Sequence, residues 1–228
     1  MLGAYFDQFN VVLLIATPRF TNVSLVVILA VVMFWGLLGG GFLVPRRWQS
    51  VLELIYHYIR GAALDSLGRA GLSYVPFLLC LFLFILLLNL LGLFPYVFAP
   101  TAQFILTFGL SASILLGVTF SGLWRFGLSY FSILVPNGAP FMLAPFLVLI
   151  ETVGYLSRAV SLGMRLAANI TAGHLLFSIV STFVFTLSSL PVLVLIFITL
   201  LEGAVVLIQA YVFCLLTAIY LKDTLELH

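Results

Sequence analysis

The stretch SLGMRLAANITAGH, residues 161–174, decides between two folds for the C-terminal half of this chain. It lies within a long apolar run and yet contains Arg165, Asn169 and His174. An arginine at the centre of a bilayer costs roughly 2.5–3.5 kcal/mol on insertion scales. The stretch is therefore either a loop between two short membrane spans or the middle of one long helix that carries polar side chains inside the membrane.

The composition is that of a membrane protein. Of the 228 residues, 64% are hydrophobic and 7% are charged, whereas a soluble domain carries about 25% charged residues. Cys80 and Cys214 both fall in apolar runs, which favours small packing residues over a disulfide. We expect a single membrane domain over residues 1–228, with an all-α polytopic fold and no soluble lobe.

Three apolar segments predict transmembrane helices that run roughly perpendicular to the membrane plane, at residues 24–44, 74–98 and 104–123. Between the first two, residues 46–70 carry apolar side chains at helical spacing, with charged residues elsewhere around the helix. This pattern predicts an amphipathic helix on the membrane surface. Asn89 lies within the second span, where we expect it to bond a neighbouring helix.

The rest of the chain predicts two long helices, at residues 142–188 and 191–221. The first has no proline or strong turn signal after Pro145, and a continuous helix there would reach roughly 65 Å, about twice the roughly 30 Å hydrocarbon core. If this run crosses the membrane once, Arg19 stands on one side and the other basic residues outside the run stand opposite: Arg46, Arg47, Arg60, Arg69, Arg125 and Lys222. This asymmetry fits the positive-inside rule and weakens if the run is split. We therefore expect a long, strongly tilted helical hairpin rather than a loop around residues 157–169.

The hairpin brings polar residues to equal depths. Counting outward from its turn, His174 falls opposite Glu202, and Asn169 falls opposite Gln209. Arg165 lies nine residues before His174, so the two side chains point to opposite sides of the helix at about 100° per residue. The long helix is thus expected to have two polar faces, on opposite sides and at different depths.

These groups suit proton transfer. A histidine beside a carboxylate, as with His174 and Glu202, can relay protons because histidine titrates near neutral pH. Arg165 cannot give up its proton, so it interrupts the path, and Glu151 lies on its far side. Two half-paths then have to be joined by a carboxylate on a mobile partner. Structural alternatives stay open: a salt bridge from Arg165 to Glu202 or Glu151, a purely structural role for Arg158, a backbone hydrogen bond from Gln209, a satisfied core position for His174, and an ordinary interfacial position for Glu151.

Three stretches resemble subunit a of the F-type ATP synthase, in its membrane (Fo) sector: ETVGYLSRAVSLGMRLAANITAGHLL at 151–176, EGAVVLIQAYVFCLLTAIYL at 202–221, and NLLGLFPY at 89–96. The mitochondrial branch of that family is the one this chain resembles, because the histidine falls on the first hairpin helix and the glutamate on the other. The resemblance implies a proton-translocating stator subunit. Its two offset half-channels would pass protons to and from a rotating c-ring to drive ATP synthesis.

The resemblance also implies roles for the polar residues. Arg165 would match the essential arginine that faces the ring carboxylate and acts as a charge barrier, with Asn169 and Gln209 as its polar neighbours. His174 and Glu202 would match the inlet half-channel from the intermembrane space.

On the exit side, toward the matrix, the resemblance places Glu151. It implies a multi-pass protein of the mitochondrial inner membrane, with the N-terminus toward the intermembrane space and the C-terminus toward the matrix. The implied partners are the c-ring, the peripheral-stalk and other Fo membrane subunits, protons and the lipid bilayer, without nucleic acid. The chain has no phosphate-binding glycine loop, so it would be the non-catalytic proton-channel subunit of the enzyme, with no cofactor and no metal. A His–Glu pair favours H⁺ over Na⁺.

Two other classes of membrane protein compete with this interpretation. A secondary ion transporter could also hold a mid-membrane His/Glu/Arg relay, but such proteins usually show an internal repeat, and none is visible between the halves. A haem-carrying respiratory subunit would need paired intramembrane histidines, and His174 alone is available.

Overall fold

The computed structural model describes residues 9–12, 21–38, 47–94, 97–127, 130, 143–187 and 190–225. Its elements are helices, in the order α2 (Asn22–Leu38), α3 (Arg47–Leu67), the 3-10 helix η2 (Gly68–Tyr74), α4 (Val75–Leu93), the 3-10 helix η3 (Pro100–Ala102), α5 (Phe104–Phe126), α6 (Ala144–Leu187) and α7 (Leu190–Leu225). Among these described residues, four helical segments are long and apolar enough to cross a membrane. The predicted all-α polytopic membrane fold is confirmed.

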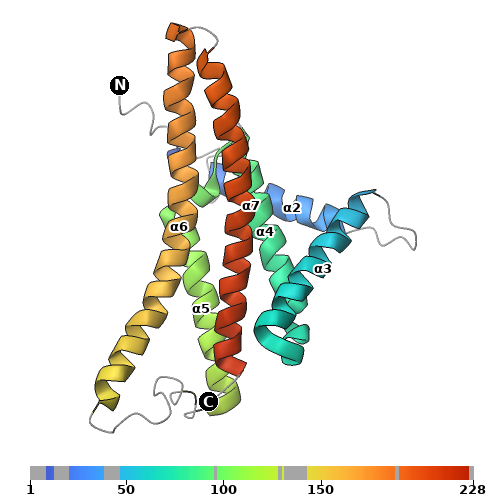
Figure 1. Cartoon of the computed structure of the whole chain (residues 1–228), viewed down its shortest axis with the longest axis vertical. Helices are drawn as coiled ribbons and strands as arrows, with labels where there is room; N and C mark the ends of the chain where they lie inside the picture. Colours follow the sequence, from blue (N-terminus) through green and yellow to red (C-terminus); the bar gives the residue numbers. More distant parts are fainter. Residues whose placement is uncertain are drawn as a thin grey trace.

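The stretch from Ser161 to His174 is helical throughout. It lies inside α6, which runs for 44 residues without a break, so the loop alternative is wrong. The 36-residue α7 returns antiparallel to it (Figure 1). At about 1.5 Å per residue these helices reach roughly 65 and 54 Å, well beyond a roughly 30 Å hydrocarbon core. The strong tilt predicted for them in a membrane stays a prediction. The turn near residue 189 lies outside the described residues.

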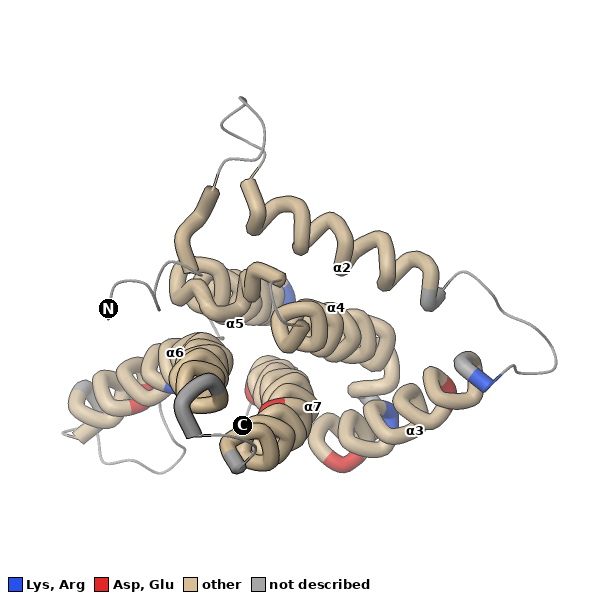
Figure 2. The backbone as a smooth tube through the Cα atoms, turned by 90° about the horizontal axis from the view of Figure 1, so that it is seen from above, with Lys and Arg blue, Asp and Glu red and all other residues tan. Residues whose placement is uncertain are grey.

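Behind the hairpin stand α4 and α5, which correspond to the spans expected at 74–98 and 104–123. Both are seen nearly end-on in Figure 2, beside α6 and α7. Pro76 lies in the first turn of α4, where its missing N–H costs no hydrogen bond. Gly127, with φ of 59° and ψ of −137°, ends α5 in a positive-φ conformation that favours glycine.

The N-terminal helices lie differently. In Figures 1 and 2 α2 runs across the direction of α4 and α5 rather than alongside them. It has 17 described residues, fewer than the roughly 20 that a perpendicular crossing needs, and residues 39–44 of the expected span lie outside the described part. The crossing at 24–44 therefore stays a prediction. The helix expected at 46–70 is present as α3, which packs against α7 and α4 and leaves Leu54 exposed. Its place on the membrane surface stays a prediction.

The core lies where α3, α4, α6 and α7 meet. On α6, Leu162, Leu166 and Ile170 are each less than 8% exposed, and their spacing of four residues defines one inward stripe of the helix. Cys80 and Cys214 are free thiols, as expected, but Cys80 is exposed and only Cys214 packs in the core.

A close crossing of α5 and α6 occurs at Gly163. A Cβ built there would lie 2.8 Å from Ser111 Oγ and 3.1 Å from both Phe108 Cα and the Thr107 carbonyl oxygen. Only a residue without a side chain allows the two helices to approach this closely. Because Gly163 lies two residues before Arg165, this crossing also sets where the arginine sits relative to α5.

Candidate functional site

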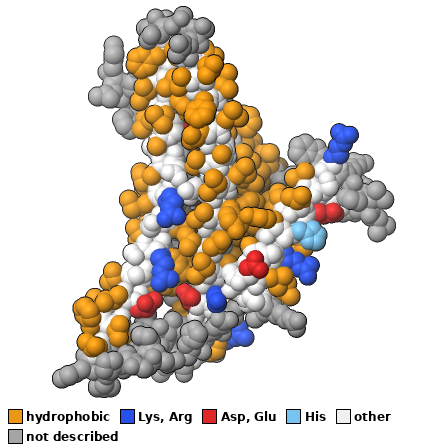
Figure 3. Space-filling view, viewed as in Figure 1, with side chains coloured by type: hydrophobic (Ala, Val, Ile, Leu, Met, Phe, Trp, Pro, Cys, Tyr) orange, Lys and Arg blue, Asp and Glu red, His pale blue; other side chains and the backbone are white. Residues whose placement is uncertain are grey.

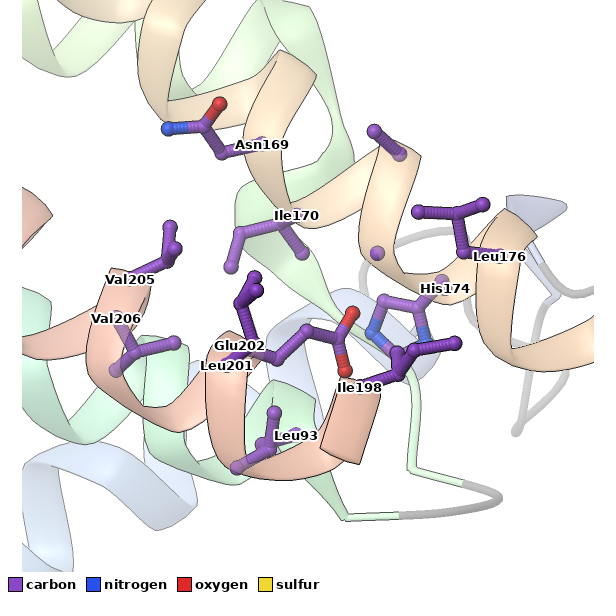
Figure 4. A pocket seen from close by; sticks show the side chains of 12 residues that line it. Leu93, Asn169, Ile170, His174, Leu176, Ile198, Leu201, Glu202, Val205 and Val206 are labelled. Atoms are coloured by element: carbon purple, nitrogen blue, oxygen red, sulfur yellow. The ribbon is translucent and has the colours of Figure 1, made fainter. Parts of the chain in front are cut away.

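A cavity of about 260 Å³ lies between α6 and α7, and Leu93 of α4 closes part of it. Most of its lining is apolar, but His174, Glu202 and Asn169 also line it. Figure 4 shows the Glu202 carboxylate directed toward the His174 ring, whereas the Asn169 amide points away from both. The predicted register of His174 with Glu202 therefore agrees with the structure.

His174 occupies the inward stripe of α6, four residues after Ile170. Its ring meets Phe9 edge-on, with ring centroids 6.2 Å apart, and hydrogen-bonds to the backbone of Gly92. Within the described residues no ion pair or hydrogen bond joins His174 to Glu202 directly. A proton passing between them would need a bridging water, and a cavity of this size has room for several, at about 30 Å³ each.

Glu202 begins the inward stripe of α7, which continues through Val206, Ala210 and Phe213. Its side chain crosses to α6 and lies over Gly173, which is buried. The contact of Glu202 with Gly173 was missed by sequence reasoning.

Arg165 faces the opposite way. It is exposed, in an open groove along α6 that Ser157, Ser161 and Ala168 also line. The guanidinium donates a long hydrogen bond to Ser161 Oγ, at 3.5 Å. In the described ranges no carboxylate lies within ion-pair distance of Arg165, so the alternative of a salt bridge to Glu202 or Glu151 is wrong for this structure.

Asn169 and Gln209 are not joined by a hydrogen bond in the part of the chain that the structure describes. Gln209 is 7% exposed, on the inward side of α7, and Asn169 is half-buried at the edge of the cavity. Asn89 is fully buried, yet neither atom of its amide has a hydrogen-bond partner in the described residues. The expectation that Asn89 bonds a neighbouring helix is therefore wrong, and a buried water is the usual partner for such a group.

A second charged cluster lies where α6 begins and α7 ends. Arg158 is 3.3 Å from Glu151 on its own helix and 3.7 Å from Asp223 on α7. These side chains are 40–48% exposed, and Figure 3 shows charged side chains on the lower part of the hairpin, below a surface covered by hydrophobic side chains. Asp223 was missed by sequence reasoning because it lies beyond the expected end of the second hairpin helix at 221. Arg158 thus has a structural contact to α7, which agrees with the alternative of a purely structural role for this residue.

The described residues contain no group of three or more His, Cys, Asp or Glu side chains that could hold a metal ion. The fold and the site together define a helical, multi-pass membrane protein with a polar cavity between two helices that are long and apolar enough to span a membrane. Ionisable groups within such helices usually mark an ion or substrate path.

Comparison with known proteins gives the particular family. The family model described as ATP synthase A chain matches residues 20–222. ATP synthase subunit a of Metridium senile is 54% identical over 235 residues, covering 100% of both chains. The subunit a of Brassica napus is 41% identical, with 97% of this chain and 96% of the relative covered. That of Rhodospirillum rubrum is 39% identical, with 92% and 90% covered.

The chain belongs to the ATP synthase subunit a family. It is a membrane subunit of the Fo sector, part of the proton-transporting ATP synthase complex and associated with other Fo subunits. This membership sets aside the secondary transporter and the haem-carrying subunit.

Proposed function

We propose that this chain is the proton-translocating stator subunit of an F-type ATP synthase, with two offset half-channels that serve a rotating c-ring. The observation that carries the proposal is the placement of Arg165. It is exposed on one side of α6 with no acidic partner within the described chain, while His174 and Glu202 share a cavity on the inner side of the same helix. A permanent cation left without a counter-ion on an apolar face suits a partner that brings the carboxylate.

On the inlet side, a proton passes through the cavity by way of Glu202 and His174 and neutralises a ring carboxylate. The neutral carboxyl can then face lipid, which an ionised one cannot do without a large desolvation cost. The wide apolar surface of the hairpin, including Met164, Leu207 and Ile208, each more than half exposed, suits contact with apolar ring helices.

On the exit side, the protonated site releases its proton near Glu151. The emptied carboxylate next meets Arg165, which attracts it and keeps the two half-channels apart. Asn169, one turn of α6 from Arg165, is the proposed polar neighbour of this contact, whereas Gln209 is buried on the inward side of α7 and could reach it only after a change of rotamer. Each elementary charge that crosses the field is worth about 2.3 kcal/mol per 100 mV, so several protons are needed for each ATP.

The proposed location is the mitochondrial inner membrane, with the N-terminus toward the intermembrane space and the C-terminus toward the matrix. Charge placement supports this orientation, since the cluster of Glu151, Arg158 and Asp223 lies at the end of the hairpin where Lys222 also lies. The proposed partners are the c-ring and the peripheral-stalk subunits. The chain itself is proposed to be non-catalytic, with nucleotide chemistry carried out elsewhere in the complex.

The proposal is tested by replacing Arg165 with alanine in the assembled complex. The expected result is loss of proton-driven ATP synthesis, because the ring carboxylate no longer meets a fixed cation. Arg125→Ala is the matched control, since Arg125 is an exposed arginine in the last turn of α5 and does not line the groove that holds Arg165. If Arg165→Ala complexes synthesise ATP at a near-normal rate, the barrier role is wrong.

The inlet is tested separately with His174→Ala and Glu202→Gln. Both variants should slow proton flux in vesicles that contain the complete complex, without reducing the amount of complex assembled. Flux that matches the wild type across the pH range would remove the substituted residue from the path.

A further inference from the structure

Gly173 differs from the other described glycines of the hairpin in what surrounds it. A Cβ at Gly154 or Gly203 would meet nothing within 4 Å, and one at Gly163 would meet the backbone of α5. A Cβ at Gly173 would overlap the Glu202 carboxylate and would lie 2.6 Å from Glu202 Cδ and 3.0 Å from Cγ. The carboxylate thus occupies the space that any side chain at position 173 would fill.

We propose that Gly173 is a positioning residue for the Glu202 carboxylate. The missing side chain leaves space on α6 for the Glu202 carboxylate, and Gly173 precedes His174, which lines the same cavity. Figure 4 shows the carboxylate directed toward the His174 ring. This inference rests on the proposed function, in which Glu202 and His174 pass the incoming proton.

The geometry distinguishes positioning from helix packing. The three atoms that a Cβ at Gly173 would meet all belong to the flexible end of one glutamate side chain, which can move by rotating about its χ angles. No backbone atom is among those three nearest atoms, so α6 and α7 need not separate. Alanine is also a better helix former than glycine. A Gly173→Ala substitution therefore moves the carboxylate away from His174 and leaves the hairpin in place.

The test uses complete complexes in sealed vesicles, with proton flux measured per assembled complex. We expect Gly173→Ala to slow flux by about tenfold, since misplacing a reacting group by about 1 Å typically costs this much or more. Gly109→Ala is the matched control, because Gly109 is a helical glycine of α5 whose Cβ would meet nothing within 4 Å. Its flux should equal that of the wild type.

A shorter acid at position 202 should relieve the effect of Gly173→Ala if that effect acts through the carboxylate, but not if Gly173 serves only helix packing. Aspartate at position 202 lacks one methylene and leaves room for a methyl group at position 173. In the Glu202→Asp background, adding Gly173→Ala should change flux by less than about twofold, so the two substitutions are coupled. A structure of the Gly173→Ala complex supplies the direct readout, with the carboxylate displaced from α6 and the helix positions unchanged.

Several results would overturn the proposal. Gly173→Ala complexes with wild-type flux would do so, as would equal slowing in the Glu202 and Glu202→Asp backgrounds, or failure to assemble in both. If the Glu202→Asp background carries too little flux to measure, the structure of the variant decides, and an unmoved carboxylate or separated helices count against positioning. Glu202→Gln distinguishes a failure of the proposed inlet from a failure of the positioning role of Gly173. If Glu202→Gln leaves flux unchanged, the proposed inlet itself is wrong. If Glu202→Gln blocks flux but Gly173→Ala has wild-type flux, only the positioning role of Gly173 is wrong.

Discussion

Gly163 and Gly173 lie on the same helix, and the structure predicts opposite consequences when each is replaced by alanine. At Gly173 the new methyl group meets a mobile carboxylate, and function should change. At Gly163 it meets Ser111 Oγ and backbone atoms of α5, which cannot move without moving the helix. Gly163→Ala should therefore weaken the α5–α6 crossing and alter proton flux little.

The magnitude follows from the distances. The Cβ contacts at Gly163 would be 2.8–3.1 Å, whereas ordinary contact begins near 3.4 Å, so α5 and α6 must separate by a few tenths of an ångström. Overpacking of this kind costs about 1–3 kcal/mol, and the better helix propensity of alanine returns up to about 1 kcal/mol. With about 1 kcal/mol returned, the net loss is up to about 2 kcal/mol and near 1 kcal/mol at the middle of the range, and Gly163→Val should cost more.

The effect on flux is worked from Coulomb's law. If the crossing opens and carries Arg165 about 0.5 Å, the distance from the guanidinium to an approaching carboxylate changes from about 4 Å to about 4.5 or about 3.5 Å. At an effective dielectric of about 20, the attraction changes by about 0.5 kcal/mol, which is roughly a twofold effect. Stability should fall clearly while flux per complex stays within about twofold.

The assay is heat inactivation of the purified complex, followed by flux measurements on the fraction that remains assembled. A loss of 1 kcal/mol lowers the midpoint by roughly 2–4 °C for a chain of this size. Gly109→Ala again serves as the control, because its Cβ would lie in open space. If Gly163→Ala complexes inactivate at the wild-type temperature or above it, the close crossing does not limit the packing of α6, and the reasoning is refuted.

Three further predictions concern contacts between elements. A double-mutant cycle with Arg158→Gln and Asp223→Asn should give a coupling of only about 0.2–1 kcal/mol in heat stability, because the two side chains are 40% and 41% exposed; a coupling of several kcal/mol would contradict this weak pairing. Thr171→Val removes a hydroxyl that donates to the Ala102 carbonyl at 3.3 Å and should cost about 0.5–1.5 kcal/mol, so an unchanged inactivation midpoint would argue against the bond. A membrane-permeant maleimide should label Cys80, which is exposed, much faster than Cys214, which is buried and contacts the Leu78 carbonyl, and equal labelling rates would contradict that difference.

The hairpin could be predicted from sequence because its signals are carried by the whole chain. The absence of proline after Pro145 and the one-sided distribution of arginines both indicate a single continuous helix, and α6 runs for 44 residues. Equal depth then follows from the antiparallel arrangement, which is why His174 and Glu202 were correctly placed together. Depth alone does not fix rotation about the helix axis, however. Asn169 and Gln209 share a depth, but no hydrogen bond joins them within the described residues.

The contacts that sequence reasoning missed depend on atoms that sequence does not display. Gly173 has no side chain to suggest chemistry, and its role follows only from where the Glu202 carboxylate lies. Phe9 lies far from His174 along the chain, yet their rings meet. A weak signal did exist for Gly173, since the register that paired His174 with Glu202 also brings the preceding small residue close to the same carboxylate.

The separation of Arg165 from His174 explains why the proposed path must leave this chain. Nine residues of α-helix place the two about 13.5 Å apart along the axis and half a turn around it. The inward stripe of Leu162, Leu166 and Ile170 packs α6 against its neighbours between them. A proton that reaches His174 therefore cannot continue along the inner side of α6 past this apolar stripe, and the outer face at the depth of Arg165 bears a fixed positive charge. Under the proposed function, a ring carboxylate that moves past the outer face carries the proton between the two half-channels. Proton flow is therefore coupled to rotation of the ring.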